Sequence, residues 1–329
     1  MSTFKALLLE KNEQSVTATL KELAVNDLHE GEVLISVAYS TLNYKDGLAV
    51  TNRAPVVRQF PLVPGIDLAG IVEESTSAAY QPGDGVILTG WGVGEMYWGG
   101  LAQKARVHSD WLVPLPDGLS LQNAMALGTA GFTAMLAVLA LEAHDITPDS
   151  GEVVVTGAAG GVGSVAIALL AKLGYTVVAS TGRVDTATDY LMKLGASRVM
   201  GRFTPSKRAL EKELWAGAVD TVGGETLAAL TRQMVRWGSV AVCGMAGGGD
   251  LPATVYPFIL RGVNLLGIDS VMSPFITRQI AWQRLTETMT PELLELITER
   301  VIGLVEVPAV SQDIMQGQVR GRVVVDVNR

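Results

Sequence analysis

A glycine-rich turn between an apolar run and a helical run limits what this chain can fold into. The turn reads Gly157-Ala158-Ala159-Gly160-Gly161-Val162-Gly163. Residues 152–156 are rich in β-branched side chains and predict a buried strand; 164–173 predict a helix and 175–179 a second strand. In such a βαβ unit the backbone can approach a pyrophosphate at the helix N-terminus, which is typical of dinucleotide-binding domains. The alternative is a tight turn without a ligand.

The residues at the end of the second predicted strand indicate whether the chain would bind NAD or NADP. An Asp or Glu there would bind the ribose 2′-hydroxyl of NAD and repel a 2′-phosphate. This chain instead has Ser180, Thr181, Gly182 and Arg183. Hydroxyls and a guanidinium suit a phosphate, and Arg202, after a predicted strand at 197–200, could reach the same side of the adenosine. The sequence favours NADPH over NADH; the alternative is that both arginines are solvated surface charges.

Length, charge and cysteine content narrow the class of protein. A chain of 329 residues is longer than a single hydrophobic core usually supports, so two domains are expected. The net charge of −8 argues against nucleic acid or an anionic membrane as the main partner. Cys243 is the single cysteine, which excludes an internal disulfide and is compatible with a reducing cytosol. The first residues enter a strand-like run at 6–9 rather than a secretory signal, so a cytoplasmic location is expected.

The apolar pattern changes along the chain. Strand-length runs at 33–39, 70–73 and 86–89, separated by Gly, Pro and Asp turns, suggest a β-rich domain up to residue 123. From 124 strands alternate with helical patterns; the strands are expected at 152–156, 175–179, 197–200, 218–222, 239–243 and 264–268. Six such strands predict an α/β fold with a doubly wound parallel sheet. The tail from 272, with a last strand at 322–327, is expected to return to the first domain. The uncharged stretch 118–141 holds several polar residues and predicts a buried helix rather than a membrane span.

Seven stretches spread over nearly the whole chain carry a resemblance to a known family. They are residues 40–46 (STLNYKD), 64–67 (PGID), 88–95 (LTGWGVGE), 98–102 (WGGLA), 128–135 (GTAGFTAM), 220–223 (DTVG) and 269–272 (DSVM). With these motifs the chain resembles the medium-chain dehydrogenase/reductase superfamily, in its zinc-free quinone-oxidoreductase branch. Within that branch it is similar to the NADPH-dependent acrylyl-CoA reductases.

The resemblance implies both an architecture and an activity. A GroES-like catalytic domain is expected at 1–123 and 272–329, and an NADPH-binding Rossmann domain at 124–271. The implied reaction is NADPH-dependent reduction of the carbon–carbon double bond of a small enoyl-CoA, acrylyl-CoA to propionyl-CoA. The alternatives are an NADPH:quinone oxidoreductase and, in a different class, a non-catalytic NADPH-binding protein. The expected partners are a small-molecule substrate and a second copy of the chain, without nucleic acid or membrane.

Residue types argue against a catalytic metal. Catalytic zinc takes three ligands from Cys, His and Asp or Glu. The zinc-bearing relatives carry Gly-His-Glu where this chain has Gly65-Ile66-Asp67, and its three histidines, at 29, 108 and 144, are scattered. No metal is therefore expected.

The resemblance also assigns residues to the site. The catalytic candidates are Asn43 and Tyr44, which are expected at a strand end before an Asp-Gly turn. The resemblance places the Tyr44 ring beside the nicotinamide. The alternative for Tyr44 is a cap on the β-core. Tyr44 is also a cofactor-binding candidate. The other cofactor-binding candidates are Thr129, Thr133, Ala159, Gly160, Gly161, Val162, Ser180, Thr181, Gly182, Arg183, Arg202, Gly244, Met245, Ile268, Ser270, Gly317 and Arg322.

The last predicted strand of the parallel sheet suggests how two copies would associate. Residues 263–268 are apolar apart from one Asn, and no charge lies between Arg261 and Asp269. An exposed apolar edge strand invites pairing with another chain. A homodimer that extends the sheet across a two-fold axis is therefore expected. The alternative is that a helix predicted at 277–288 covers the edge.

Overall fold

The computed structural model describes residues 2–13 and 15–329, which form two compact units. Unit 1 comprises the described residues up to Thr129, together with Val271–Thr286 and Ile297–Arg329. Unit 2 comprises Ala130–Ser270 and Glu287–Leu296. Each unit has its own sheet and its own buried core.

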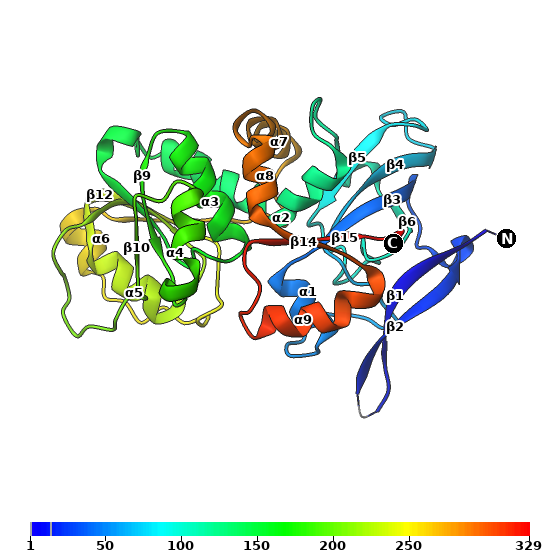
Figure 1. The fold of residues 1–329 in the computed structure, drawn as a ribbon, viewed down its shortest axis with the longest axis horizontal. Helices are drawn as coiled ribbons and strands as arrows, with labels where there is room; N and C mark the ends of the chain where they lie inside the picture. Colours follow the sequence, from blue (N-terminus) through cyan, green and yellow to red (C-terminus); the bar gives the residue numbers. More distant parts are fainter. Residues whose placement is uncertain (1, 14) are drawn as a thin grey trace. The chain divides into compact units, whose positions relative to one another are not determined.

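Within the described part of the chain, unit 2 is built on a six-stranded parallel sheet surrounded by helices (Figure 1). The strands are β8 (Glu152–Val155), β9 (Thr176–Ser180), β10 (Arg198–Met200), β11 (Trp215–Asp220), β12 (Met234–Val242) and β13 (Asn264–Gly267). Their spatial order is β10-β9-β8-β11-β12-β13, so the winding direction reverses beside β8. This is the doubly wound Rossmann order, and it confirms the predicted fold class.

The helices of unit 2 follow the strands in sequence. They are α3 (Gly161–Lys172), α4 (Val184–Lys193), α5 (Gly224–Arg232) and α6 (Tyr256–Arg261); most of α8 (Pro291–Ile297) also belongs to this unit. All residues of α3 from Gly163 to Leu170 are buried, which explains its continuous apolar sequence. Gly174 follows α3 with φ of 90°, a conformation that favours glycine and ends the helix.

Among the described residues, unit 1 holds a seven-stranded sheet whose backbone path has the order β14-β15-β3-β4-β5-β7, with β6 paired to β3. The strands are β3 (Val33–Leu42), β4 (Asp67–Ser75), β5 (Gly85–Thr89), β6 (Lys104–Val107), β7 (Leu112–Pro114), β14 (Thr298–Gly303) and β15 (Arg322–Asp326). β15 pairs antiparallel with β3, placing Val324 opposite Thr41. The C-terminal tail therefore returns to the β-rich sheet, as predicted.

A second β element, the start of α2 (Leu121–Glu142) and further helices belong to the described part of unit 1. β1 (Thr3–Lys11) and β2 (Val16–Ala24) pair antiparallel as a hairpin. The further helices are α1 (Tyr44–Val50), α9 (Val307–Met315) and most of α7 (Phe275–Thr288). α1 packs beside α9 (Figure 1), where a Cβ at Gly47 would lie 2.9 Å from the Met315 sulfur.

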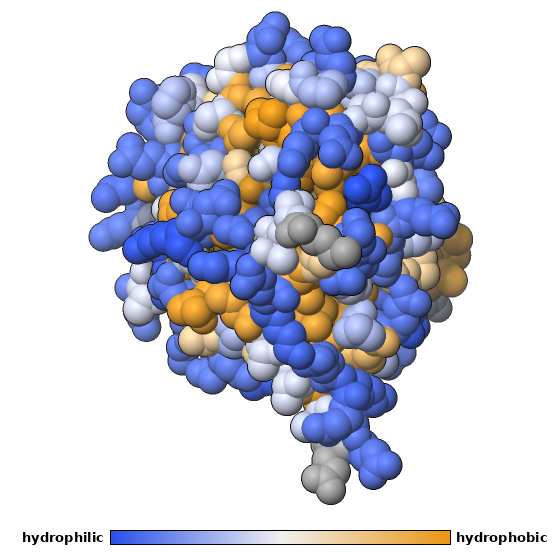
Figure 2. Space-filling model, turned by 90° about the vertical axis from the view of Figure 1, so that its right-hand side faces the viewer, coloured by the Kyte–Doolittle hydropathy of each residue, from blue (hydrophilic) through white to orange (hydrophobic). Residues whose placement is uncertain are grey.

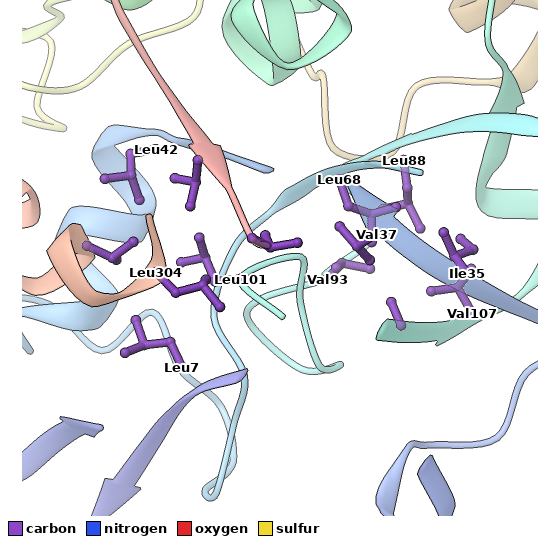
Figure 3. Packing of buried hydrophobic residues seen from close by; sticks show 14 of the residues in the cluster. Leu7, Ile35, Val37, Leu42, Leu68, Leu88, Val93, Leu101, Val107 and Leu304 are labelled. Atoms are coloured by element: carbon purple, nitrogen blue, oxygen red, sulfur yellow. The ribbon is translucent and has the colours of Figure 1, made fainter. Parts of the chain in front are cut away.

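The core of unit 1 lies between its sheet and these elements. Figure 3 shows residues of this core, including Leu7 from β1, Ile35 and Val37 from β3, and Leu304 from the tail. The face of the molecule in Figure 2 is mostly covered by hydrophilic residues, with hydrophobic residues visible between them. Burial of apolar side chains from the first and last parts of the sequence makes the tail an integral part of this unit.

α2 (Leu121–Glu142) is the long apolar helix and it is interrupted. By length and composition it could cross a membrane, but most of its apolar window is buried inside the protein, as in an ordinary core helix. Gly128 has φ of 50° and ψ of −154°, so the helical backbone breaks there and resumes at Thr129. The prediction of a buried helix is confirmed, whereas the break was not predicted.

Several predicted boundaries were wrong by three residues or more. β11 begins at Trp215 rather than at 218, and β12 begins at Met234 rather than at 239. The sequence pattern missed the start of β12 because Trp237, with φ of 64°, interrupts the apolar alternation where the β11–β12 register shifts. α3 begins at Gly161 rather than at 164, since glycines do not reveal a helix start by propensity.

Candidate active site

The glycine-rich turn joins β8 to α3 in unit 2, and two of its glycines have no room for a side chain. A Cβ at Gly157 would lie 2.1 Å from Thr221 Oγ1, and one at Gly163 would lie 2.5 Å from the Gly157 carbonyl oxygen. Gly157 also has φ of 57°. The predicted contacts Ala159, Gly160, Gly161 and Val162 lie in this turn and at the first residues of α3. First-turn amides of a helix have no intrahelical acceptor, so this turn fits the pyrophosphate of a dinucleotide.

Two guanidinium groups lie at the carboxyl end of β9. The Arg202 side chain packs against Gly182, where a Cβ would lie 2.4 Å from Arg202 Nε. Arg183 donates from Nη2 to the Ala159 carbonyl at 2.9 Å, which places its guanidinium beside the glycine-rich turn. The structure thus brings Arg183 and Arg202 to one place, as the sequence predicted. The donors there suit the 2′-phosphate of NADPH.

The hydroxyls at this strand end already have protein partners. Ser180 donates to the Gly201 carbonyl at 3.0 Å, and Thr181 Oγ1 accepts the amide of Arg183 at 3.1 Å. These bonds fix the backbone between the two arginines. The Thr181 hydroxyl accepts in this bond and keeps its hydrogen for donation to an anion, whereas the Ser180 hydroxyl has already donated its hydrogen to Gly201.

Asp220, at the carboxyl end of β11, organises the neighbouring strand ends and was not singled out as a site residue. Its carboxylate accepts the Thr156 hydroxyl at 2.6 Å and the Gly223 amide at 2.8 Å. Burial raises the pKa of Asp220, and these bonds oppose the increase. An acid directly at the end of a buried strand is the sequence signal that identifies it.

Gly244 and Met245 follow β12 at the same edge of the sheet. A Cβ at Gly244 would lie 1.9 Å from the Thr221 carbonyl oxygen, so the chain passes too close for any other residue. Met245 is 70% exposed. Burial raises the pKa of the neighbouring Cys243 thiol to about 12, with Asp220 adding to the increase. A thiol with a raised pKa carries little thiolate at neutral pH, which fits a structural role for Cys243.

The remaining predicted residues of unit 2 lie on α2 and after β13. Thr133 is buried on α2. Ile268 donates its amide to the Val242 carbonyl at 3.0 Å and is half-buried, as is Ser270.

In unit 1, β3 ends at Leu42 and Tyr44 begins helix α1, so the predicted strand end is confirmed to within two residues and the predicted Asp-Gly turn is wrong. The cause is Asp46, whose carboxylate accepts the backbone amide of Asn43 at 2.9 Å and so caps the first turn of the helix. Tyr44 itself is 46% exposed. Its ring is thus available for a ligand instead of closing the β-core.

Arg322 is a buried residue of unit 1, and Asn43 is a half-buried one. Arg322 is 2% exposed; it donates from Nε to the Ala126 carbonyl at 3.0 Å and from Nη2 to Thr41 Oγ1 at 2.9 Å. Its Nη1 lies 3.2 Å from Asn43 Oδ1, which accepts this bond. Gly317 lies on the tail after α9 with φ of 68°. Thr129 is described with Asp67 below.

Two carboxyl groups, those of Asp46 and Asp67, are buried in this part of unit 1. Burial and the neighbouring Asp67 raise the pKa of Asp46 to about 6. Burial also raises the pKa of Asp67, while hydrogen bonds from Thr129 and Asn43 and the charge of Arg322 lower it. Among residues 2–13 and 15–329, no three His, Cys, Asp or Glu side chains gather in a way that could hold a metal ion.

Comparison with known proteins shows the family. Residues 29–117 match the alcohol dehydrogenase GroES-like domain, and residues 161–288 match the zinc-binding dehydrogenase family. The acrylyl-CoA reductase AcuI of Ruegeria pomeroyi is 56% identical over 99% of both chains. The putative quinone oxidoreductase YhfP of Bacillus subtilis is 50% identical over 99% of both chains, and its crystal structure with bound NAD has a TM-score of 0.96, covering 99% of this chain and 100% of that one.

A third relative has been crystallised with the predicted cofactor. The structure of Escherichia coli YhdH with bound NADPH has a TM-score of 0.96 at 51% identity, covering 98% of this chain and 100% of that one. The two-unit fold and its glycine-rich turn define a dehydrogenase/reductase. The chain belongs to the medium-chain dehydrogenase/reductase superfamily and, within it, to the family of the acrylyl-CoA reductase AcuI.

Proposed function

We propose that this protein is a zinc-independent, NADPH-dependent oxidoreductase that reduces the carbon–carbon double bond of a small enoyl-CoA, acrylyl-CoA to propionyl-CoA. The observation that carries the proposal is the 56% identity to an acrylyl-CoA reductase over 99% of both chains. The fold agrees with it, since the carboxyl edge of the parallel sheet is where dinucleotides bind in Rossmann domains.

The cofactor site proposed in unit 2 follows from its strand ends. The turn after β8 and the start of α3 would receive the pyrophosphate, and Arg183 and Arg202 would hold the 2′-phosphate. Gly244 and Met245, with Thr133, Ile268 and Ser270, are proposed to contact the rest of the cofactor. NADPH, when bound, supplies the hydride for the reduction.

Unit 1 would supply the groups that act on the substrate. Hydride adds to the β-carbon of the enoyl thioester, the thioester oxygen gathers enolate charge, and a proton then reaches the α-carbon. A hydrogen-bond donor must therefore be positioned beside the thioester oxygen before the charge develops. We assign this role to the Tyr44 hydroxyl or to backbone amides, with water as the source of the proton. The GroES-like domain at 1–123 and 272–329 and the Rossmann domain at 124–271 remain our proposed division of these tasks.

A comparison of two substrates tests the proposed activity. With NADPH in excess, we expect kcat/KM for acrylyl-CoA to exceed that for a short-chain quinone at least tenfold. A clear preference for the quinone would replace the thioester reduction with quinone reduction, the activity named for the 50% identical YhfP. Tight NADPH binding without oxidation by either acceptor would instead support a non-catalytic NADPH-binding protein.

We also propose a cytoplasmic homodimer formed through β13. β13 is the last strand of its sheet and pairs with β12 on one side. Its residues Asn264, Leu265 and Leu266 are half-buried, and nearby α6 exposes Tyr256, Ile259 and Leu260. An uncharged strand edge next to an exposed apolar helix suits antiparallel pairing with a second copy.

Leu265→Lys should weaken this dimer at least about tenfold, because each two-fold interface would then bury two lysines. Sedimentation velocity at micromolar concentration would show the wild type at twice the 34.8 kDa chain mass and the variant shifted toward the monomer. Met192→Lys, on α4 and 44% exposed, is the matched surface control and should remain dimeric. A monomeric wild type would remove the proposal, and a dimeric Leu265→Lys variant would place the interface elsewhere.

A further inference from the structure

One buried carboxylate in unit 1 connects the catalytic candidate Asn43 with the cofactor-binding candidate Thr129. Asp67 begins β4 and is completely buried. Its Oδ2 accepts the backbone amide of Thr129 at 2.9 Å, and its Oδ1 accepts the Thr129 hydroxyl. Oδ2 also accepts a bond from Asn43 Nδ2 at 2.8 Å.

The break in α2 makes this contact possible. Because the helix is interrupted at Gly128, Thr129 begins a new helical segment whose first amide points to an external acceptor. A Cβ at Gly128 would lie 2.7 Å from Asp67 Oδ2, so glycine lets the carboxylate approach. A carboxylate is a favourable cap at a helix N-terminus.

The Asn43 amide is held from three sides. Its Nδ2 lies 2.8 Å from Asp67 Oδ2 and 3.1 Å from Asp46 Oδ2, and its Oδ1 accepts the bond from Arg322. With its amide engaged inside the protein, Asn43 fixes the backbone from which Tyr44 projects. Asp67 is therefore bonded to the residue that directly precedes Tyr44.

We propose that Asp67 is a positioning residue for the reduction, holding Thr129 and the Asn43–Tyr44 turn in one fixed arrangement toward the nicotinamide. This inference rests on the proposed function. It predicts that loosening Asp67 impairs hydride transfer while the adenosine end of the cofactor, bound in unit 2 at Arg183, is little affected. A merely structural role predicts a loss of thermal stability and no change at the nicotinamide.

The test compares Asp67→Asn with Ile35→Ala, a cavity variant in the core of the same unit that lowers stability without touching the network. For Asp67→Asn we expect kcat to fall at least tenfold and the NADPH dissociation constant to change less than threefold. The fluorescence emission of bound NADPH, which reports on the nicotinamide surroundings, should also change. Ile35→Ala should leave kcat and the emission as in the wild type.

A double-mutant cycle shows whether Asp67 acts through Thr129. Thr129→Val removes one of its donors, so the losses of kcat in Thr129→Val and Asp67→Asn should not multiply in the double variant. Unchanged kcat and unchanged NADPH emission in Asp67→Asn, with a lowered Tm, would overturn the inference. If the wild-type protein reduces neither acrylyl-CoA nor a quinone, the proposed function fails by itself, and the NADPH emission still decides the role of Asp67.

Discussion

Arg183→Ala should weaken NADPH binding by about tenfold to 150-fold and NADH binding much less. A charge-assisted hydrogen bond to a phosphate contributes roughly 1.5–3 kcal/mol to binding. NADH has no 2′-phosphate, so its binding does not depend on this bond. The Arg183 guanidinium also holds the Ala159 carbonyl at 2.9 Å, and loss of that bond affects both cofactors alike. The ratio of the two dissociation constants therefore isolates the phosphate contact. Fluorescence titration of each cofactor measures it.

Two further arginine variants sharpen this experiment. Arg202→Ala should also lower the selectivity for NADPH over NADH, because the Arg202 guanidinium lies against Gly182, the residue directly before Arg183. Arg198→Ala is the control: Arg198 on β10 pairs with Glu152 on β8 at 2.8 Å, and its loss should leave the ratio unchanged. Equal losses of NADPH and NADH affinity in Arg183→Ala would refute its assignment to the 2′-phosphate.

Asp46 should make the protein less stable as the pH rises from 4 to 7. Its pKa is about 6 in the folded protein, raised from 3.8 by burial and by Asp67. A folded-state pKa above the unfolded value means that the folded state binds the proton more tightly. The stabilisation from this proton is complete below pH 4 and is lost as the pH passes through 6. For a shift of this size the loss is about 3 kcal/mol.

Asp46→Asn removes this titration, so comparison of the wild type with the variant separates the titration of Asp46 from those of other groups. The Asn43 and Ile66 amides donate to different oxygens of Asp46, and asparagine keeps only one of these acceptors, which costs stability at every pH. The free energy of unfolding of the wild type minus that of the variant should therefore fall by about 2–3 kcal/mol between pH 4 and pH 7. Urea denaturation at several pH values measures this difference. A difference that stays constant across this range would contradict the raised pKa.

Local sequence pattern determined the nucleotide-binding half of this protein. Residues 152–179 carry a strand, a glycine-rich turn, a helix and a second strand in consecutive order, and the structure has β8, α3 and β9 there. Such elements can be recognised because their side-chain periodicity and glycines are read within one short window. The same holds for Arg183 after β9 and Arg202 after β10, since the first residues after parallel strands share one end of the sheet.

Tertiary structure alone decided the network around Asp67. Asp67 and Thr129 are 62 positions apart in the chain, and Arg322 reaches Thr41 across 281 positions. Neither pair leaves a periodic pattern, because a buried hydrogen bond between distant residues depends on how strands and helices meet. The helix start at Tyr44 was missed for a related reason: Asp46 caps it while also accepting the Ile66 amide, 20 positions away. Side-chain types thus identified which residues carry the chemistry, and long-range packing fixed which of them hold one another in place.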